Sequence, residues 1–391
     1  MNEVYIVGIQ RTPVGAFNGK LASVKATELG AIALKAALAQ AGVPASSVDE
    51  VFMGNVMSAN LGQAPATQVA LAAGLPDTVP CTTINKVCAS GTKAAMLAAN
   101  MIRLGDAHIV VAGGMENMSQ VPHYVQSYRT GHKFGNTELL DGVVKDGLQD
   151  VYSGMMMGEA AELCAAKYSI SREAQDEYAI RSYKRAIEAT ENGSLKPYIS
   201  PVTIQGRKGD VIVDTDEEPA NVLWDKIPTL KPAFKKEGTI TAANASKLND
   251  GATAMILASE KAVKELGLKP LARIVSYADA ALKPEWFTIA PNDAVRLALK
   301  RAGLKAADMS FFEINEAFSV VAMANQQLLE VDAEAVNPFG GAVAFGHPLG
   351  SSGARLIQSM VTGLKLRGGK YAAMGICNGG GGASAMVLEN V

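Results

Sequence analysis

The sequence has few cysteines and no long apolar run. Cysteine occurs four times among 391 residues, at Cys81, Cys88, Cys164 and Cys377, with no CxxC pair and no spacing typical of a zinc site. So few cysteines in a chain of this length do not form a disulfide scaffold, and we expect a reducing compartment. No run of about eighteen apolar residues occurs, so we expect no transmembrane helix.

A large excess of charge of either sign is also missing. The formal net charge is −2, which gives no electrostatic reason to expect nucleic acid or an anionic membrane as a partner. The start, MNEVYIVGIQRTPVG, lacks the basic and apolar segments of a signal peptide, and the end, MVLENV, carries no peroxisomal tripeptide. We therefore expect a cytoplasmic protein with no membrane and no nucleic-acid partner.

The composition that is present suits a large buried interior. Hydrophobic residues make up 48% of the chain and charged residues 19%, and the length suggests two or three domains. Strand-like runs such as EVYIVGI, EVFMGNV and AHIVVAGG alternate with alanine-rich helical stretches. This order predicts an α/β fold with largely buried strands.

Parts of the sequence resemble each other. ALKAALAQAGVPASSVDEVFM from Ala33 and AVRLALKRAGLKAADMSFFEI from Ala294 both read as a helix, an Ala-Gly turn and a strand. SGTKAAM from Ser90 and SGARLIQ from Ser352 form a second pair, and each opens a helix. Two related halves are the simplest explanation of such a repeat.

A region of different texture separates the two halves. It contains SYRTGHKFGN, a methionine run and the polar stretch QGRKGDVIVDTDEEPAN, and we interpret it as an inserted, loop-rich domain. The predicted units are an N-terminal half, the inserted domain and a C-terminal half, at residues 1–118 with about 242–270, 119–241 and 271–391.

Cys88 lies between polar residues, just before a predicted helix. In NKVCASGTKA the cysteine is followed by small residues and then by good helix formers. A thiol at a helix N-terminus faces unpaired N–H groups and the positive end of the dipole, and both favour the thiolate. A small core residue near a turn is the alternative, and the decapeptide alone leaves both open.

The second half holds further candidates at strand ends and helix starts, where α/β folds build sites. They are Asn315 in EINEAF, His347 in AFGHPLGSSGAR and Cys377 in GICNGGGGASAM. The glycine run would let backbone N–H groups form an oxyanion hole. Two cysteines and a histidine without metal spacing indicate covalent thiol chemistry with proton transfer. Glu316 fits an acid catalyst or a cap of the next helix.

Four blocks of the sequence, NKVCASGTKA, NEAF, GHPLGSSGAR and CNGGGGASA, resemble the signature blocks of the thiolases. The likeness extends over essentially the whole chain, including RTPVGAFNG, GGMENMS and TAANASKLNDGA. Within the family, the chain is most similar to the acetoacetyl-CoA (biosynthetic) thiolases. The resemblance implies duplicated βαβαβαββ halves in α-β-α-β-α layers, an inserted loop domain and no covalently bound cofactor.

The resemblance also implies a reaction, the reversible condensation of two acetyl-CoA molecules to acetoacetyl-CoA and CoA. Cys88 would be acetylated in a ping-pong cycle, after activation by His347. His347 would then polarise the thioester oxygen of the second substrate, together with a water held by Asn315. The N–H groups of Cys88 and Gly379 would form a second oxyanion hole, and Cys377 would move the α-proton.

Coenzyme A is expected to lie across the inserted domain. Ser246 matches the family position that bonds the pantetheine arm, and Lys226 matches a lysine near the nucleotide end. Two positions depart from relatives. Met156 and Met157 precede a glycine where many members have His-Met-Gly, and Phe287 replaces a methionine linked to 2-methyl-branched substrates.

The resemblance further implies a potassium site and a tetramer. Tyr183 stands where potassium-stimulated relatives have a tyrosine, and its proposed co-ligands are the backbone carbonyls of Ala242, Ala243, Ala245 and Val343. Residues 121–141 resemble the family's tetramerisation loop, which predicts a homotetramer built as a dimer of dimers. Its aromatic residues would pack between dimers or line a small core of the insertion; they are Tyr124, Tyr128 and Phe134.

Three other functions are compatible with parts of the sequence. A broader-range 3-ketoacyl-CoA thiolase, active on 2-methyl-branched substrates, would share every block. A decarboxylating condensing enzyme of the ketoacyl-synthase type would need no second cysteine, so Cys377 argues against it. A CoA- or lipid-binding module without activity would have lost one of the four blocks, and none is lost.

Overall fold

A ten-stranded mixed sheet runs through the computed structural model, which describes residues 2–391. The strand order is β12-β13-β14-β11-β1-β10-β5-β3-β4, with β2 paired to β10. The strands of the first half are β1 (Val4–Arg11), β2 (Gly15–Ala16), β3 (Glu50–Gly54), β4 (Cys81–Ile84), β5 (Ile109–Asn117) and β10 (Asn249–Ser259). Those of the second half are β11 (Ala272–Ala281), β12 (Met309–Ile314), β13 (Tyr371–Asn378) and β14 (Gly382–Asn390).

Both halves of the sheet have the same pairing. In the first half, β3 pairs with β5 in parallel, whereas β5 with β10 and β10 with β1 are antiparallel. In the second half, β12 pairs with β13 in parallel, whereas β13 with β14 and β14 with β11 are antiparallel. The halves join where Tyr5 and Ile6 of β1 pair with β11. The duplication predicted from the sequence is thus confirmed in the strand order.

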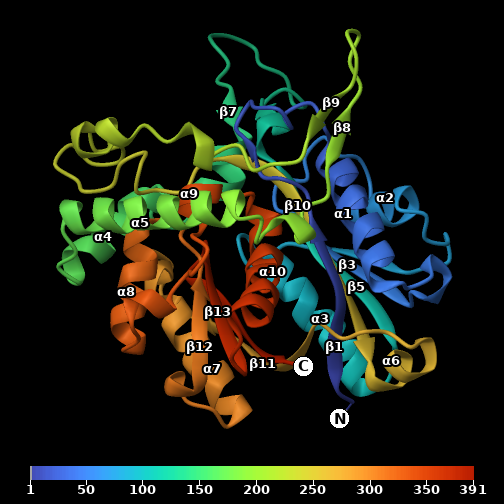
Figure 1. Cartoon of the computed structure of the whole chain (residues 1–391). Coiled ribbons are helices and arrows are strands. Elements are labelled where there is room, and N and C mark those ends of the chain that lie inside the picture. The colour runs from blue at the N-terminus through green and yellow to red at the C-terminus, as the bar shows by residue number, and fades with distance from the viewer. Residues whose placement is uncertain (1) are drawn as a thin grey trace.

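The helices form three layers around the two halves of the sheet (Figure 1). Helices α3 and α10 lie in the middle and pack on each other, and one apolar cluster joins them to both halves. Helices α1, α2 and α6 cover the outer face of the first half, and α7 and α8 cover that of the second. Their bounds are α1 (Ala26–Ala41), α2 (Pro65–Ala72), α3 (Ser90–Leu104), α6 (Glu260–Leu266), α7 (Ala290–Ala302), α8 (Ser319–Leu329) and α10 (Leu349–Arg367). The predicted α-β-α-β-α layering is confirmed.

The repeated Ala-Gly pair ends equivalent helices. Helix α1 ends at Gly42 with φ 67° and α7 ends at Gly303 with φ 68°, both in the left-handed region. A Cβ at either glycine would meet no atom within 4 Å, so the backbone angle rather than space requires glycine there. The sequence repeat therefore encodes a helix stop.

The inserted region 119–241 is less loop-rich than expected. It contains the helices α4 (Met157–Lys167) and α5 (Arg172–Glu191), the hairpin of β6 (His123–Tyr124) and β7 (Leu140–Asp141), and the hairpin of β8 (Val202–Ile204) and β9 (Val211–Val213). Helix α5 has a serine N-cap, Ser171, whose hydroxyl accepts a hydrogen bond from the N–H of Ala174. It buries Tyr178 and Tyr183 on one face, a helical spacing that the sequence already contained. The domain boundaries stay a prediction.

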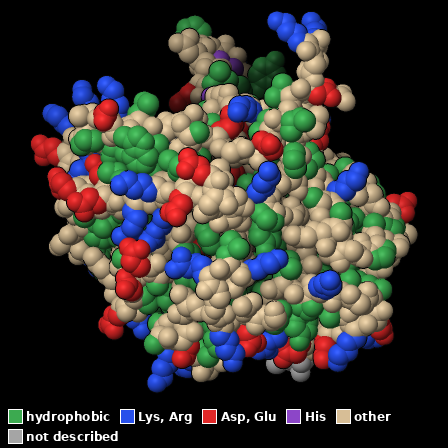
Figure 2. All heavy atoms as spheres, in the orientation of Figure 1, with side chains coloured by type: hydrophobic (Ala, Val, Ile, Leu, Met, Phe, Trp, Pro, Cys, Tyr) green, Lys and Arg blue, Asp and Glu red, His purple; other side chains and the backbone are tan. Residues whose placement is uncertain are grey.

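The surface carries charges of both signs. On the face shown in Figure 2, basic and acidic side chains are intermixed rather than gathered by sign. Within residues 2–391, no helix combines the length and the apolar character needed to cross a membrane.

Candidate active site

Helices α3 and α10 bring two candidate residues together. A Cβ on Gly91 of α3 would lie 2.8 Å from the backbone nitrogen of Ala354, and one on Gly353 of α10 would lie 2.5 Å from Oγ1 of a threonine on α3. These glycines permit the close contact between the two helices. Cys88 stands two residues before α3, and His347 stands two residues before α10. The first turns of both helices therefore face one site.

The thiol of Cys88 is free and half-buried. Burial raises the pKa of Cys88 to about 12, although the backbone N–H groups of Gly379 and of Cys88 itself lower it. The charge of Glu116 raises the pKa further. Desolvation thus outweighs the N–H groups, which act in the direction that the sequence predicted. Nucleophilic attack by Cys88 needs a base.

The turn before Cys88 is held in an unusual conformation. Val87 has φ 47°, a region that disfavours β-branched residues. Two residues before Cys88, the ammonium of Lys86 lies 2.5 Å from Oδ1 of Asp279 and 2.8 Å from Oγ of Ser384, both on strands of the second half. This anchor could not be predicted from the sequence, because Lys86 and Asp279 are far apart in the chain and their spacing forms no motif.

His347 has the hydrogen-bonding pattern of a base. Its Nδ1 lies 2.6 Å from Oγ of Ser352, and the same hydroxyl donates to the carbonyl of Pro348 at 3.0 Å. The hydroxyl of Ser352 has one hydrogen, and that hydrogen is in the bond to Pro348. Nδ1–H of His347 therefore donates to the hydroxyl oxygen, and Nε2 carries the free lone pair. Nε2 is buried and bonds to no described residue. Burial, and then the charge of Arg355, lower the pKa of His347 to about 3, so the ring is neutral.

Asn315 has an unpaired side-chain amide. The residue follows β12, and its backbone N–H donates to the carbonyl of Gly375 at 2.9 Å. Its side chain is buried, yet neither Oδ1 nor Nδ2 bonds to a residue within 2–391. A buried amide without partners is rare in proteins unless a water or ligand meets it. This arrangement suits the water-holding role that the resemblance implies.

Cys377 lies fully buried on β13, in an apolar cluster with Cys164, Phe287 and Phe318. Burial raises its pKa well above the ordinary value, and the charge of Cys88 raises it further. The two thiols are therefore near enough for the ionisation of one to oppose that of the other. Cys377 needs help to lose its proton, as Cys88 does.

The glycine run after Cys377 has mainly a structural reason. Gly380 and Gly381 have φ 83° and 86° in the turn between β13 and β14. A Cβ on Gly381 would lie 2.3 Å from the carbonyl oxygen of Leu282. Only Gly379 directs its N–H to Cys88. The run is therefore needed by the hairpin, and one of its N–H groups contributes to the site.

Glu316 does not cap helix α8, which has no side-chain cap. Its carboxylate accepts hydrogen bonds from Tyr178 and Ser182 of α5, each at 2.8 Å. It also accepts from Nδ2 of Asn337 at 2.9 Å and from the N–H of Val343 at 3.1 Å, in helix α9 (Ala342–Phe345). The helix-cap reading is therefore wrong, and these contacts make Glu316 a structural link between the insertion and the second half.

A cavity of about 520 Å³ lies beside the insertion. Met156, Met157 and Ser246 line it, as expected for residues near pantetheine. Its wall is largely apolar and includes Phe234 and Phe318. An apolar channel suits the pantetheine chain of a CoA thioester.

A second cavity of about 220 Å³ is lined by Lys226 and Tyr183. Both cavities share Glu218, Ala242 and Lys247, so they adjoin. The predicted CoA residues thus divide between two neighbouring cavities. Phe287 lines neither of them.

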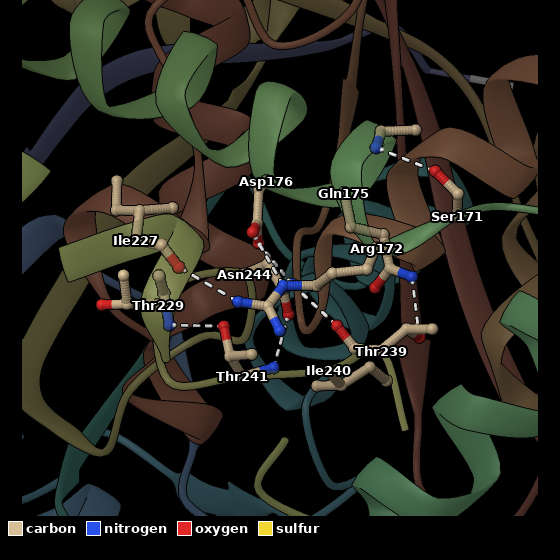
Figure 3. Close-up of polar contacts among 12 residues, drawn as sticks. Ser171, Arg172, Gln175, Asp176, Ile227, Thr229, Thr239, Ile240, Thr241 and Asn244 are labelled. Atoms are coloured by element: carbon tan, nitrogen blue, oxygen red, sulfur yellow. Dashed lines mark hydrogen bonds and ion pairs between the residues drawn. The ribbon is translucent and has the colours of Figure 1, made fainter. Parts of the chain in front are cut away.

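A polar network fixes the segment that leads to Ser246 (Figure 3). Asp176 of α5 accepts from Nε of Arg172 at 2.7 Å and from Nδ2 of Asn244 at 2.8 Å. Oδ1 of Asn244 in turn accepts from the N–H of Thr241 at 2.8 Å. This network holds the cavity wall against α5.

The predicted potassium ligands do not fit a potassium ion in this chain. The ammonium of Lys247 donates to the hydroxyl of Tyr183 and, at 2.7 Å, to the carbonyl of Val343. These are two of the five expected ligands, and a fixed positive charge at both would repel a cation. Burial lowers the pKa of Lys247 to about 8, whereas Glu218 and Glu316 raise it. Two of the five predicted ligands are therefore already bound to a cationic side chain.

A base with a free nitrogen, two thiols and an adjoining apolar channel suit an enzyme that carries an acyl group on sulfur. Two family descriptions match the chain, "Thiolase, N-terminal domain" over residues 4–261 and "Thiolase, C-terminal domain" over 268–390. The chain belongs to the thiolase family.

Similar proteins are known over the whole length of the chain. An acetyl-CoA acetyltransferase of Schizosaccharomyces pombe is 54% identical, covering 100% of this chain and 99% of that protein. A cytosolic acetyl-CoA acetyltransferase of Gibberella zeae is 53% identical, covering 99% and 98%. The crystal structure of a thiolase from Ascaris suum with coenzyme A has a TM-score of 0.95 and 43% identity, covering 100% of both chains. The predicted family and fold are confirmed.

Proposed function

We propose that the chain is an acetyl-CoA C-acetyltransferase, which condenses two acetyl-CoA molecules to acetoacetyl-CoA and CoA in a reversible reaction. The observation that carries the proposal is the free, buried Nε2 of neutral His347, placed at the helix start that faces Cys88. The names of the S. pombe and G. zeae relatives support the same substrate.

In the first half-reaction, Nε2 of His347 takes the proton of Cys88 as the sulfur attacks the carbonyl carbon of acetyl-CoA. The N–H groups of Cys88 and Gly379 stabilise the oxyanion that forms. The bond between the acetyl carbon and the CoA sulfur then breaks, and the CoA thiolate takes the proton of Cys377. Acetyl-Cys88, protonated His347 and a Cys377 thiolate remain.

In the second half-reaction, the Cys377 thiolate takes the α-proton of a second acetyl-CoA. His347, through Nε2–H, and a water on the amide of Asn315 stabilise the enolate oxygen. The enolate carbon attacks acetyl-Cys88, and acetoacetyl-CoA forms. The released Cys88 thiolate recovers its proton from His347, and every proton is then back at its starting place.

Mass spectrometry of the enzyme mixed with acetyl-CoA tests this function. We expect one added acetyl group on the peptide that carries Cys88, and loss of that group when CoA is added. A wild-type enzyme that gains no acetyl group and does not cleave acetoacetyl-CoA with CoA would overturn the proposal.

The range of acyl substrates is proposed to be narrow. Phe287 lies in a short 3-10 helix, Pro284–Ile289, and is buried in the cluster that contains Cys377. Its ring fills space in the same apolar cluster as the thiol that handles the α-carbon, and a 2-methyl branch would need room there. Thiolysis rates of acetoacetyl-CoA and its 2-methyl derivative test this, and equal rates would favour the broader-range alternative.

The assembly and location are also proposals. Tyr128 and Phe134 are 84% and 97% exposed, so they line no core within their own chain, and a homotetramer would cover them. Tyr124 instead donates to Asp146 at 2.5 Å. Light scattering that shows a stable monomer would contradict the tetramer. A cytosolic location is supported by the name of the G. zeae relative and by four free cysteines.

A further inference from the structure

Lys247 lies where the cavity wall, the insertion and the histidine loop meet; we use the name histidine loop for residues 343–347, which end at His347. Lys247 follows Ser246, stands two residues before β10 and lines both adjoining cavities. Its ammonium donates to the hydroxyl of Tyr183 on α5 and, at 2.7 Å, to the carbonyl of Val343 on α9. It also lies 4.8 Å from the centre of the Tyr183 ring. One positive charge therefore connects three segments that are far apart in the sequence.

The charge also fixes the peptide of Val343. Lys247 holds the carbonyl of this residue, whereas the carboxylate of Glu316 accepts its N–H at 3.1 Å. Val343 stands only four residues before His347. Both polar groups of one residue in the histidine loop are thus bound by buried or half-buried charged side chains.

A second path leads from the same charge to His347. Glu218 lines the same two cavities as Lys247 and accepts from Nδ2 of Asn249 at 3.2 Å. Burial raises the pKa of Glu218, and the charge of Lys247 opposes that rise. Oδ1 of Asn249 accepts from the N–H of His347 at 2.9 Å. The backbone of the proposed base is therefore held by the side chain of Asn249, which also bonds to Glu218 beside Lys247.

We propose that the ammonium of Lys247 replaces a bound monovalent cation, positions the loop that carries His347, and makes the enzyme independent of potassium. This inference rests on the proposed role of His347. The two oxygen atoms that Lys247 contacts, on Tyr183 and Val343, are two of the five expected potassium ligands. Removing the side chain should therefore free both for a potassium ion. Lys247 is a positioning residue and takes no part in proton transfer.

The activity test compares two substitutions at one position. We expect the wild type to be equally active in potassium, sodium or choline chloride at equal ionic strength. Lys247→Ala should lose up to about 10²-fold in kcat in choline chloride, because misplaced catalytic groups cost about that much. Potassium or ammonium chloride should restore most of the loss. Lys247→Met should lose as much and recover nothing, since its side chain fills the space without charge.

Two measurements without catalysis accompany the activity test. Potassium should raise the melting temperature of Lys247→Ala relative to choline, and should leave that of the wild type unchanged. Trp224 packs edge-on against Tyr183 with ring centres 6.2 Å apart, so it reports on this site. In a Trp286→Phe background, potassium should change the fluorescence of Trp224 in Lys247→Ala only.

A matched control uses a lysine far from the site. Lys264→Ala removes an exposed i,i+4 ion pair with Glu260 and should show no response to the choice of cation. If Lys247→Ala does not fold in choline chloride, we compare its refolding yields in potassium chloride and in choline chloride instead of its melting temperatures.

Potassium stimulation of the wild type would overturn the inference. So would a Lys247→Ala variant whose melting temperature, or refolding yield, and fluorescence ignore potassium. Because these readouts require no turnover, they separate this inference from the proposed function. A wild type that gains no acetyl group would count against the proposed reaction. The effect of potassium on melting temperature and fluorescence would still decide whether Lys247 replaces a cation.

Discussion

Ser352 determines which nitrogen of His347 is the base. Its hydroxyl donates to the carbonyl of Pro348 at 3.0 Å and lies 2.6 Å from Nδ1 of His347, so Nδ1 donates and Nε2 is left free. Both residues belong to the turn that opens α10, and both are buried. The histidine therefore reaches the site in one tautomer, with its basic nitrogen unbonded.

Ser352→Ala should allow either ring nitrogen of His347 to carry the hydrogen. We expect kcat to fall by about 10²-fold with little change in KM for acetyl-CoA, because base catalysis is weakened while the CoA cavity is intact. Ser351→Ala is the matched control: its hydroxyl bonds to Thr253 at 3.0 Å rather than to the histidine. Steady-state kinetics of both variants test this prediction. An equal loss of kcat in Ser351→Ala and Ser352→Ala would contradict a specific role for Ser352.

Cys88 should be alkylated before the other buried thiols. Cys88 is half-buried, whereas Cys164 and Cys377 are fully buried. Burial raises the pKa of the Cys88 thiol to about 12, so rapid labelling near neutral pH depends on proton transfer to His347. Brief treatment with iodoacetamide, followed by mass spectrometry, should label Cys88 first, and acetyl-CoA should protect it. His347→Asn should slow this labelling, and an unchanged rate would show that another group is the base.

Cys377→Ala should separate the two half-reactions. Cys88 should still accept an acetyl group, because its attack on the first thioester uses His347, and protonated His347 or solvent can supply the proton of the departing CoA. Exchange of the α-proton of acetyl-CoA with deuterated solvent should stop, and condensation should fall by about 10²–10⁴-fold. The Cys88→Ala control should form no acyl-enzyme. Normal proton exchange in Cys377→Ala would mean that His347 or water takes the α-proton.

Asn315→Ala should impair catalysis without unfolding the protein. Its amide bonds to none of residues 2–391, so truncation breaks no internal hydrogen bond, while loss of an oxyanion donor costs about 10²–10³ in kcat. Asn337→Ala provides the contrast, because the Asn337 amide donates to Tyr178, Ile314 and Glu316. It should mainly lower the melting temperature. A comparable fall in melting temperature for Asn315→Ala would point to a structural role instead.

Much of the fold was predictable because its signals are local. The Ala-Gly pairs at Gly42 and Gly303 encode helix stops, and they revealed the duplication. The helical spacing of α5 was present too, but it was hidden by the polar and methionine-rich stretches around it. The helix starts beside Cys88 and His347 could be placed for the same reason, since small residues and helix formers mark them.

The electrostatic state of the site was not predictable. The start of α3 suggested a thiolate at Cys88, yet burial raises the pKa of that thiol, and burial depends on elements far away in the chain. Glu316 read as a catalyst or a helix cap until Tyr178 and Ser182 were seen to bond to it. Neighbouring residues in the sequence say little about the desolvation of a side chain or about its contacts with distant segments. The pKa of Cys88 and the partners of Glu316 could therefore not be predicted.

The sequence by itself determined the thiolase family, the duplicated α/β fold and the residues that stand at its strand ends and helix starts. Those features depend on backbone preferences and short motifs, which neighbouring residues encode. Only the tertiary structure decided that His347 is neutral with a free Nε2 and that Lys247 holds Tyr183 and Val343 where a potassium site was expected. Such contacts join residues far apart in the chain, and their energies depend on burial and distance, which exist only after folding.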